Sequence, residues 1–588
     1  MNQDWILHKK ETRRYFSRST WVPLRAVCDN ENGNVREIGY VREFFGCGAV
    51  AFSPEHKEFA ERLSWSDIGI SCNTQPYADK DGYYLPVEQY QYNHKEPIGV
   101  HFVFEHPQPV VGGSLWILNP DIVIALRLIK EGTKWVRPEE NFVVVAQEKL
   151  DEKGQQCLIE IKREYLLDYL AARNLSLRLS YYRQRVENVA SLENSQYADL
   201  TNQQEQRDGG RFELRINSLD NIFGGNWALF RAWRTDVDED EDAPVMGPEN
   251  ADNTDYESSH GHRNGYAGIR VEGEFWRDEW IEHQGQSKRI RGDVDTNLPQ
   301  FIVETDGTRM ASADLNNEDI GRWLWFLPGV INKLLELRGF SLEWYTAETG
   351  GIHSTSGYMT HFGINFSDFI TVYAYDVARL PAWEQHIWAA HNIVPDGKVS
   401  RELLAAQVNT QPAHTHAVED LLFKVMEMLD DGFREEFKVS LYTHDIDPTT
   451  IQHLSRFSSK DQTSLLRLAK DLVRVFSDRL DVHELRRIST HSDKNKLRSN
   501  KLLQDILARK VGNDKAREVF APIFGTYDMR LGDAHPTSSE IGEALKLAGI
   551  DGNLSFLRQG EQLISNFGES IWRIGKLLFE NPQDQGLK

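Results

Sequence analysis

The helical part of the fold is clearest in residues 417–437, AVEDLLFKVMEMLDDGFREEF. Apolar residues recur there three and four positions apart, a spacing that places side chains on one face of an α-helix. The apolar stripe consists of Val418, Leu421, Leu422, Val425, Met428 and Leu429. Charged residues fill most positions between them. The pattern therefore predicts an amphipathic helix that buries one face against neighbouring helices.

The same period continues toward the C-terminus. It returns in residues 464–480, 502–511 and 554–579. Ser464 and Ser538 are candidate N-caps, because a serine hydroxyl can accept a hydrogen bond from a backbone N–H of the first turn. We therefore predict an all-α helical bundle over residues 415–588.

The region upstream of the bundle favours strands. Segments such as 35–45, 46–52 and 97–106 are short, rich in β-branched and aromatic residues, and separated by Gly, Pro, Asn and Asp. A mixed or antiparallel sheet fits this pattern better than βαβ units do. One helix is expected at 162–173, ending near Asn174, before an alternating strand at 175–187.

An acidic run separates two such strand-rich regions, which form either two domains or one domain with an inserted loop. Residues 236–265 are dense in acid, Gly, Pro, Asn and Ser, and they predict a flexible linker or surface loop because they cannot bury a core. Further on, a helix is expected at 319–337, kinked or divided at Pro328. The strand candidates of this region are 268–276, 300–305 and 369–377.

The chain is expected to form several domains. Its 588 residues exceed the roughly 250–300 residues over which one hydrophobic core grows. We predict an α+β multidomain protein, with two mixed strand-rich domains followed by an all-α bundle. The N-terminal domain, acidic linker, middle domain and bundle are expected at 1–235, 236–265, 266–410 and 415–588.

Composition and missing motifs narrow the functional classes. The formal net charge of −22 argues against passive coating of nucleic acid or anionic membranes, but it leaves room for a local basic groove. No window approaches the roughly 18 apolar residues of a membrane helix. Four scattered cysteines fit a reducing compartment, so we expect a cytoplasmic protein. The Walker A, Gly-x-Gly-x-x-Gly, Gly-x-Ser-x-Gly and His-Glu-x-x-His motifs are missing, which disfavours common ATPases, dehydrogenases, hydrolases and zinc proteases.

One polar element in the predicted bundle can carry chemistry. It is YDMRLGDAHPTSSEIGEAL, residues 527–545, in which Arg530 and His535 are separated by four residues. His535 can move a proton from a ribose 2′-hydroxyl near neutral pH. Arg530 can hold the scissile phosphate and stabilise its developing charge. Asp533 between them can orient the imidazole. Such a reaction needs neither a metal nor a cofactor, and none is predicted.

Arg530 and His535 in a helical bundle resemble the HEPN superfamily, whose active members are metal-independent ribonucleases marked by Arg-x4-6-His. The resemblance covers at most residues 415–588 and implies a homodimer with a shared site. It carries over to Arg530 and His535 only, since Leu531 and Pro536 depart from the common pattern. The whole chain also resembles uncharacterised bacterial defence-type proteins, which implies an antiviral effector with N-terminal sensing or scaffold domains.

Two alternatives stay open. The spacing of Arg530 and His535 recurs at Arg486 and His491, so a polar turn without catalysis explains the element as well. The chain is then a non-enzymatic assembly protein that binds nucleic acid or a companion protein. The second alternative is a metal-dependent PD-(D/E)xK-like nuclease. Its E-x-K is Glu160 and Lys162, with Asp151 upstream, and it needs a hairpin turn at Lys153-Gly154.

Basic islands are candidates for binding RNA or single-stranded nucleic acid. Near the N-terminus they comprise Lys9, Lys10, Arg13 and Arg14 beside aromatic residues. A second island, SKRIRGD, contains Arg289 and Arg291. The histidine pairs at 260–262 and 414–416 have the i, i+2 spacing of zinc ligands on a strand but no further ligand at motif spacing, so no metal site is predicted.

Overall fold

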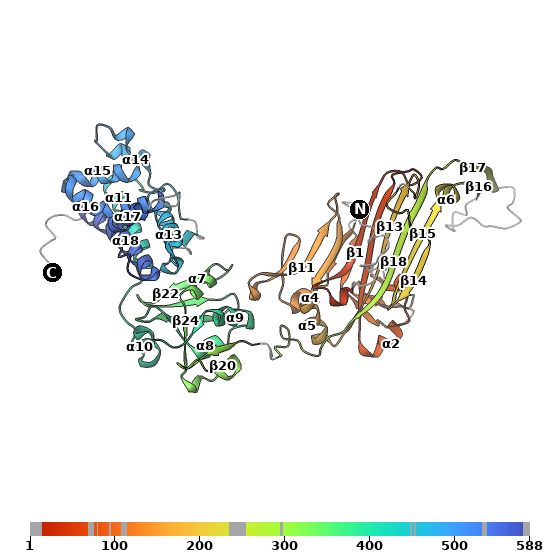
Figure 1. Cartoon of the computed structure of the whole chain (residues 1–588), viewed down its shortest axis with the longest axis horizontal. Helices are drawn as coiled ribbons and strands as arrows, with labels where there is room; N and C mark the ends of the chain where they lie inside the picture. The colour runs from red at the N-terminus through yellow and green to blue at the C-terminus, as the bar shows by residue number, and fades with distance from the viewer. Residues whose placement is uncertain are drawn as a thin grey trace. The chain divides into compact units, whose positions relative to one another are not determined.

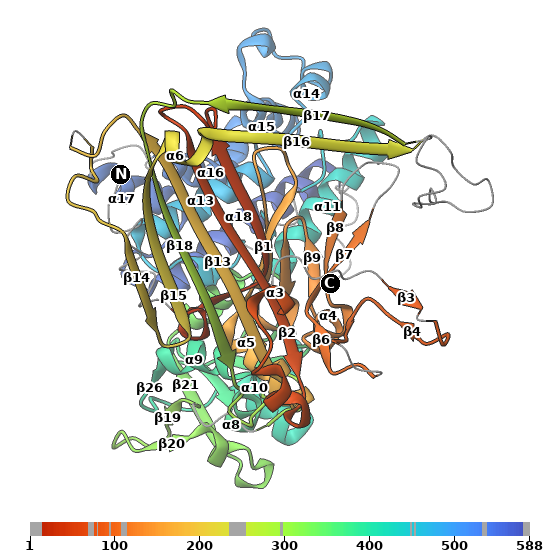
Figure 2. The same cartoon turned by 90° about the vertical axis from the view of Figure 1, so that its right-hand side faces the viewer.

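The chain forms two compact units, which Figures 1 and 2 show in two views. The first unit comprises residues 1–138 and 143–294, and the second comprises 139–142 and 295–588. The computed structural model describes residues 15–68, 76–78, 80–92, 96–107, 114–193, 195–234, 254–293, 298–446, 450–451, 454–531 and 538–579.

The first unit is built on a twelve-stranded sheet, in which neighbouring strands run antiparallel. Its main path has the order β14-β15-β18-β13-β2-β1-β12-β11-β10-β9. These strands are β14 (Gln203–Arg207), β15 (Gly210–Ser218), β18 (Ile269–Ile281), β13 (Ser176–Val189), β2 (Val41–Phe52), β1 (Trp21–Asn32), β12 (Gln156–Lys162), β11 (Val143–Leu150), β10 (Lys134–Arg137) and β9 (Ile129–Glu131). Figure 2 shows the long central strands side by side. Short strands β5 (Gln89–Tyr90) and β6 (Gly99–His101) join the sheet at β2.

Smaller elements complete the first unit. Two short hairpins pair β3 (Tyr77–Ala78) with β4 (Tyr84–Leu85) and β7 (Val103–Pro107) with β8 (Ser114–Leu118). The short helices are α2 (Lys57–Ala60), α3 (Trp65–Ile68), α4 (Pro120–Ala125) and α6 (Leu219–Phe223). The expected helix at 162–173 is confirmed as α5 (Arg163–Arg173). It ends where Asn174 adopts a left-handed conformation, with φ of 54°. Leu166 and Leu170 of α5 pack into the core beneath the sheet.

The predicted border between the first two domains was wrong. β18 pairs along its whole length with β13, from Leu177 opposite Ile281 to Val189 opposite Ile269, and its other edge pairs with β15. Residues 266–294 therefore belong to the first unit. The linker or loop predicted at 236–265 is also too long, because residues at its end form β17 (Thr254–Arg263), which pairs with β16 (Gly225–Arg234). The acidic composition marks the connection of a hairpin, not a domain border.

The second unit begins with a six-stranded antiparallel sheet of order β22-β23-β24-β25-β21-β26. Its strands are β21 (Trp323–Phe326), β22 (Ser341–Trp344), β23 (Thr349–His353), β24 (Met359–Ile364), β25 (Ile370–Tyr373) and β26 (Asn392–Ile393). A separate pair is β19 (Gln300–Ile302) with β20 (Arg309–Ala311). Its helices are α7 (Gly329–Leu335), α8 (Ala374–Ala378), α9 (Ala382–His391) and α10 (Arg401–Asn409).

The helix expected at 319–337 was only half right. Residues before Pro328 form strand β21, and the helix α7 begins only at Gly329. Leu324 and Phe326 are buried, whereas Trp323 and Trp325 are half-buried, which is the alternation of a strand. The run is short and rich in aromatic side chains, so either period fits it. Hydrogen bonding to β25 and β26 makes this segment a strand.

The C-terminal bundle is confirmed. It consists of α11 (Val418–Phe437), α13 (Gln462–Val475), α14 (Val482–Ile488), α15 (Ser499–Val511), α16 (Asn513–Leu531), α17 (Ser538–Ala548) and α18 (Phe556–Phe579). Its core unites apolar faces from most of these helices, such as Leu422, Leu472 and Ile571. The N-cap prediction at Ser464 was three positions off. Asp461 caps α13 and Ser464 bonds back to it, so the two residues form a capping box.

Sheet and bundle form one unit because they share a core and buried ion pairs. Phe457, which lies between α11 and α13, stacks on Trp344 of the sheet with ring centroids 5.6 Å apart. The adjacent Arg456 is 0% exposed. Its guanidinium lies 2.8 Å from a carboxylate oxygen of Glu419 on α11 and 2.7 Å from one of Glu561 on α18. The middle domain and the bundle are therefore not separate bodies.

None of the helices in the described ranges is long and apolar enough to span a membrane.

Candidate nucleic-acid interface

The Arg-x4-His element lies at the end of α16. Arg530 occupies the last turn of this helix, which ends at Leu531, and α17 begins at Ser538. Asp533 and His535 fall between the two helices and lie outside the described residues. The position of Arg530 inside the bundle is confirmed, whereas its convergence with His535 stays a prediction.

Arg530 is held in place without being buried. Its Nη1 lies 2.9 Å from each carboxylate oxygen of Asp478, which follows α13. Its guanidinium carbon lies 5.8 Å from the ring centroid of Tyr527, one turn earlier in α16. The side chain is 30% exposed. All its hydrogen bonds to described residues use Nη1, so Nε and Nη2 can still offer a fork to a phosphate.

Arg530 is part of a face that combines cations and aromatic rings. Phe524, Tyr527 and Arg530 are spaced three residues apart and share one side of α16. The neighbouring helix α15 contributes Lys501, whose Nζ lies 4.2 Å from the ring centroid of Phe524. Just before α15, Nη1 of Arg498 donates a hydrogen bond of 3.4 Å to Tyr527 Oη. We call these five residues the α15/α16 strip.

The strip is partly exposed, although α16 also contributes to the core of the bundle. Val519, Phe520 and Ile523 are fully buried. Phe524 and Tyr527 are only half-buried, and Arg498 is exposed. At about 100° per residue, Tyr527 and Arg530 fall in the same sector of α16 as these buried residues, and Phe524 packs partly against the bundle core, so the strip lies along the border between the core and the surface.

Positive charge concentrates beside the strip. Residues 494–501, KNKLRSNK, contain four Lys or Arg and no acidic residue, in a chain whose net charge is −22. They span a short 3-10 turn, Lys494–Lys496, and the start of α15. Sequence reasoning missed Arg498 and Lys501, although this local run of charge was a signal for them. Their proximity to Arg530 arises from packing of α15 against α16, which the spacing of residues does not show.

The second Arg-x4-His spacing has a structural role. Arg486 lies in α14, and its Nη2 donates a hydrogen bond of 3.4 Å to the carbonyl of Asn495. His491 Nδ1 accepts a bond of 3.0 Å from the backbone N–H of Asp493. The two side chains stabilise the turn between α14 and α15. Arg486 and His491 therefore form a polar turn without catalysis, which is the alternative stated above for Arg530 and His535.

The two basic islands predicted from the sequence lie away from the α15/α16 strip in the chain. Lys9, Lys10, Arg13 and Arg14 lie outside the described residues. Arg289 makes ion pairs of 2.8 Å with Asp168 and 3.0 Å with Glu164 of α5. Arg291 donates to the carbonyl of Ala171, also in α5, and pairs with Asp293. Both arginines thus bind the loop that contains them to α5. Nucleic-acid binding by these two residues stays a prediction.

The E-x-K alternative lacks a second carboxylate where it needs one. The expected hairpin is present, because β11 pairs with β12 and Gly154 has a φ of 77°. However, Asp151 accepts backbone N–H bonds within the turn itself. Opposite Glu160 on β11 stands Gln147, an amide, which donates a bond of 2.7 Å to it. Lys162 lies over the ring of Trp21. This arrangement does not favour a paired-carboxylate magnesium site.

The two histidine pairs lie in different kinds of structure. The pair at 414–416 lies outside helices and strands. The pair at 260–262 lies in β17, so its side chains share one face, and His262 Nδ1 lies 2.9 Å from Asn226 Oδ1. Within the described ranges, no cluster of three or more His, Cys, Asp or Glu side chains has the geometry of a metal site.

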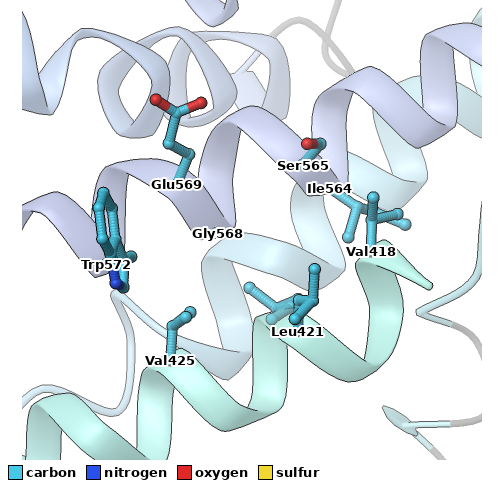
Figure 3. Close-up of a pocket in the computed structure, with 9 residues that line it drawn as sticks. Val418, Leu421, Val425, Ile564, Ser565, Gly568, Glu569 and Trp572 are labelled. Carbon is cyan, nitrogen blue, oxygen red and sulfur yellow. The ribbon is translucent and has the colours of Figure 1, made fainter. Parts of the chain in front are cut away.

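A second surface feature is an apolar groove between α11 and α18, with a volume of about 230 Å³. Figure 3 shows Leu421 and Val425 of α11 facing Ile564, Gly568 and Trp572 of α18. Gly568 lacks a side chain, which deepens the floor next to Leu422. Trp572 at the rim is 43% exposed. The apolar stripe of α11 is therefore wider than its buried face, and part of it lines this groove.

No protein-family model, curated protein or solved structure matches the chain.

Proposed function

We propose that the chain is a metal-independent ribonuclease whose reacting groups are Arg530 and His535. The supporting observation is the placement of Arg530, which is oriented by Asp478, is partly exposed and lies near Arg498, with which it shares contacts to Tyr527. His535 follows five residues later, in the connection between α16 and α17. As the resemblance implies, the role of such an enzyme is that of an effector in antiviral defence.

The proposed step uses only groups of the chain and the RNA. His535 takes the proton of a ribose 2′-hydroxyl, and the oxygen attacks the adjacent phosphorus. The bond from phosphorus to the 5′-oxygen of the next nucleotide breaks, and that oxygen gains a proton from imidazolium or water. The products are a 2′,3′-cyclic phosphate and a 5′-hydroxyl. Arg530 contacts the phosphate oxygens, on which negative charge grows during the attack.

A cleavage assay in EDTA tests the proposal. Wild type should cut single-stranded RNA, and His535→Ala and Arg530→Ala should each lose at least about 100-fold in rate. His491→Ala is a matched control, because it removes a histidine of the same Arg-x4 spacing and should leave the rate unchanged. Cleavage that needs Mg²⁺ and disappears in Lys162→Ala would instead support the E-x-K alternative.

A second candidate role is assembly, and the groove between α11 and α18 favours it. We propose that a second copy of the chain covers this groove. The exposed side of α18 presents Glu569, Trp572 and Lys576 at spacings of three and four. When two α18 helices cross antiparallel near Trp572, Glu569 of each copy approaches Lys576 of the other. The surface is thus complementary to itself in charge as well as apolar at its centre.

A further inference from the structure

We infer that the α15/α16 strip is an RNA-binding surface that leads an unpaired strand to Arg530. The inference rests on the proposed ribonuclease function and names the residues that bind the substrate away from the reacting groups. These residues are Arg498, Lys501, Phe524 and Tyr527, together with Lys494 and Lys496 of the adjoining basic run.

Charge is the first argument. A polyanion is repelled by the chain as a whole, so binding requires a local surface where cations dominate. Arg498 and Lys501 provide exposed cations for such a surface, whereas Lys496 forms an ion pair of 2.9 Å with Asp493. Asp478 is bound to Nη1 of Arg530. The phosphate can therefore use the remaining edge of Arg530 while Asp478 fixes the orientation of the guanidinium.

The aromatic rings are the second argument, and they favour an unpaired strand. Phe524 and Tyr527 lie about one helical turn apart on α16, roughly 4.5 Å along its axis. Each ring already has a cation beside it, Lys501 at Phe524 and Arg498 at Tyr527. Phe524 packs partly against the bundle core, so Tyr527 is the main ring on which an unpaired base can stack while phosphates pair with the cations. In a duplex the base faces are hidden, so the rings have no partner.

The contact geometry gives Arg498 and Tyr527 a joint role. Arg498 donates to the Tyr527 hydroxyl, and Arg530 lies over the ring of the same tyrosine. Tyr527 thus holds two guanidinium groups on one side of the bundle, one on each of two helices. Two guanidinium groups held in this way can contact successive phosphates of one strand.

Binding is tested without cleavage by using a fluorescent RNA dodecamer whose riboses are all 2′-O-methylated, with anisotropy as the readout. The full-length protein should bind the single strand at least about tenfold more tightly than the matching duplex. The double variant Arg498→Ala/Lys501→Ala should lose roughly tenfold in affinity, and its dependence on log salt should be shallower by about 1.4. Tyr527→Leu should weaken binding by about fivefold to 100-fold, and Tyr527→Phe, which keeps the ring but loses the hydroxyl that Arg498 contacts, should weaken it less than Tyr527→Leu does.

The controls separate the two claims. Lys424→Ala removes an exposed cation from α11 of the same bundle and should change neither affinity nor salt dependence. Thermal melting of each variant verifies that the bundle is intact. If cleavage depends on Arg530 and His535 but the strip variants bind like wild type, the inference is wrong and the ribonuclease stands. If the strip binds RNA as described but no RNA is cut, the proposed function fails while the surface is retained. Equal binding of duplex and single strand would also overturn the inference.

Discussion

At the scale of single residues, the second unit buries a carboxyl group in its core. Glu384 of α9 is 0% exposed and lies against the core of the middle sheet. Burial raises the pKa of its carboxyl group to about 7, although Ser354 Oγ donates a hydrogen bond of 2.6 Å to it. The ionised form is therefore the costly one in the folded state.

This pKa gives a prediction with a defined sign. The folded state binds the Glu384 proton more tightly than the unfolded chain does, so stability should fall as pH rises from about 4.5 to about 7. The loss should amount to roughly 3 kcal/mol and should be complete above pH 7. Glu384→Gln removes the charge at nearly constant shape. Urea unfolding should show the variant to be more stable than wild type by about that amount at pH 8, and equal to it near pH 4.5. Equal stability at both pH values would contradict the assignment.

At the scale of elements, the bundle and the middle sheet depend on arginines that bridge them. Arg558 of α18 lies 2.9 Å from Glu348, just before β23, and 2.6 Å from Asp368, just before β25. Arg456 has no exposed surface and binds two carboxylates. Removing one partner of such a group leaves the others buried and uncompensated, which costs more than the ion pair contributes when intact.

Arg456→Met should therefore lower the free energy of unfolding of the second unit by about 3–5 kcal/mol. Arg434→Met is the matched control, because Arg434 is 61% exposed and its partner Asp430 keeps hydrogen bonds from Ser440 and Leu441, so the change should cost less than about 1 kcal/mol. Scanning calorimetry of the full chain measures both. Similar small losses in the two variants would show that the buried network does not hold sheet and bundle together.

The elements also show what can be predicted from a sequence. The bundle was predictable because each helix carries its own apolar stripe, as in 417–437, and that stripe is local. The position of β18 in the sheet was not predictable, because its partner β13 precedes it by about 80 residues. Pairing between strands so far apart cannot be recognised from the local composition. For the candidate site, the spacing identified Arg530, while Arg498 and Lys501 reach it only through packing of α15 on α16.

At the scale of the whole molecule, the groove between α11 and α18 predicts association of two copies. Trp572→Glu should weaken association by at least about 30-fold, because the exposed ring would be the central apolar contact. Trp227→Glu is its control, since this tryptophan is similarly exposed but lies in β16 of the first unit. Analytical ultracentrifugation over a range of concentrations gives the dissociation constants.

Charge reversal identifies the partner. Glu569→Lys and Lys576→Glu should each weaken association, by roughly fivefold, because each variant places like charges opposite one another. The double variant should recover wild-type association if the partner is another copy of the chain. A protein that stays monomeric in every variant, or a double variant weaker than either single one, would contradict the two-copy arrangement.

The claim on which the functional account depends is that Arg530 and His535 cut RNA by attack of a 2′-hydroxyl. The most direct measurement is the chemistry of the product ends after incubation with RNA in EDTA. We expect 2′,3′-cyclic phosphate and 5′-hydroxyl ends from wild type, and no products from His535→Ala or from RNA that carries a 2′-deoxy substitution at the cut. Ends with a 3′-hydroxyl, or the same products from His535→Ala, would contradict the account.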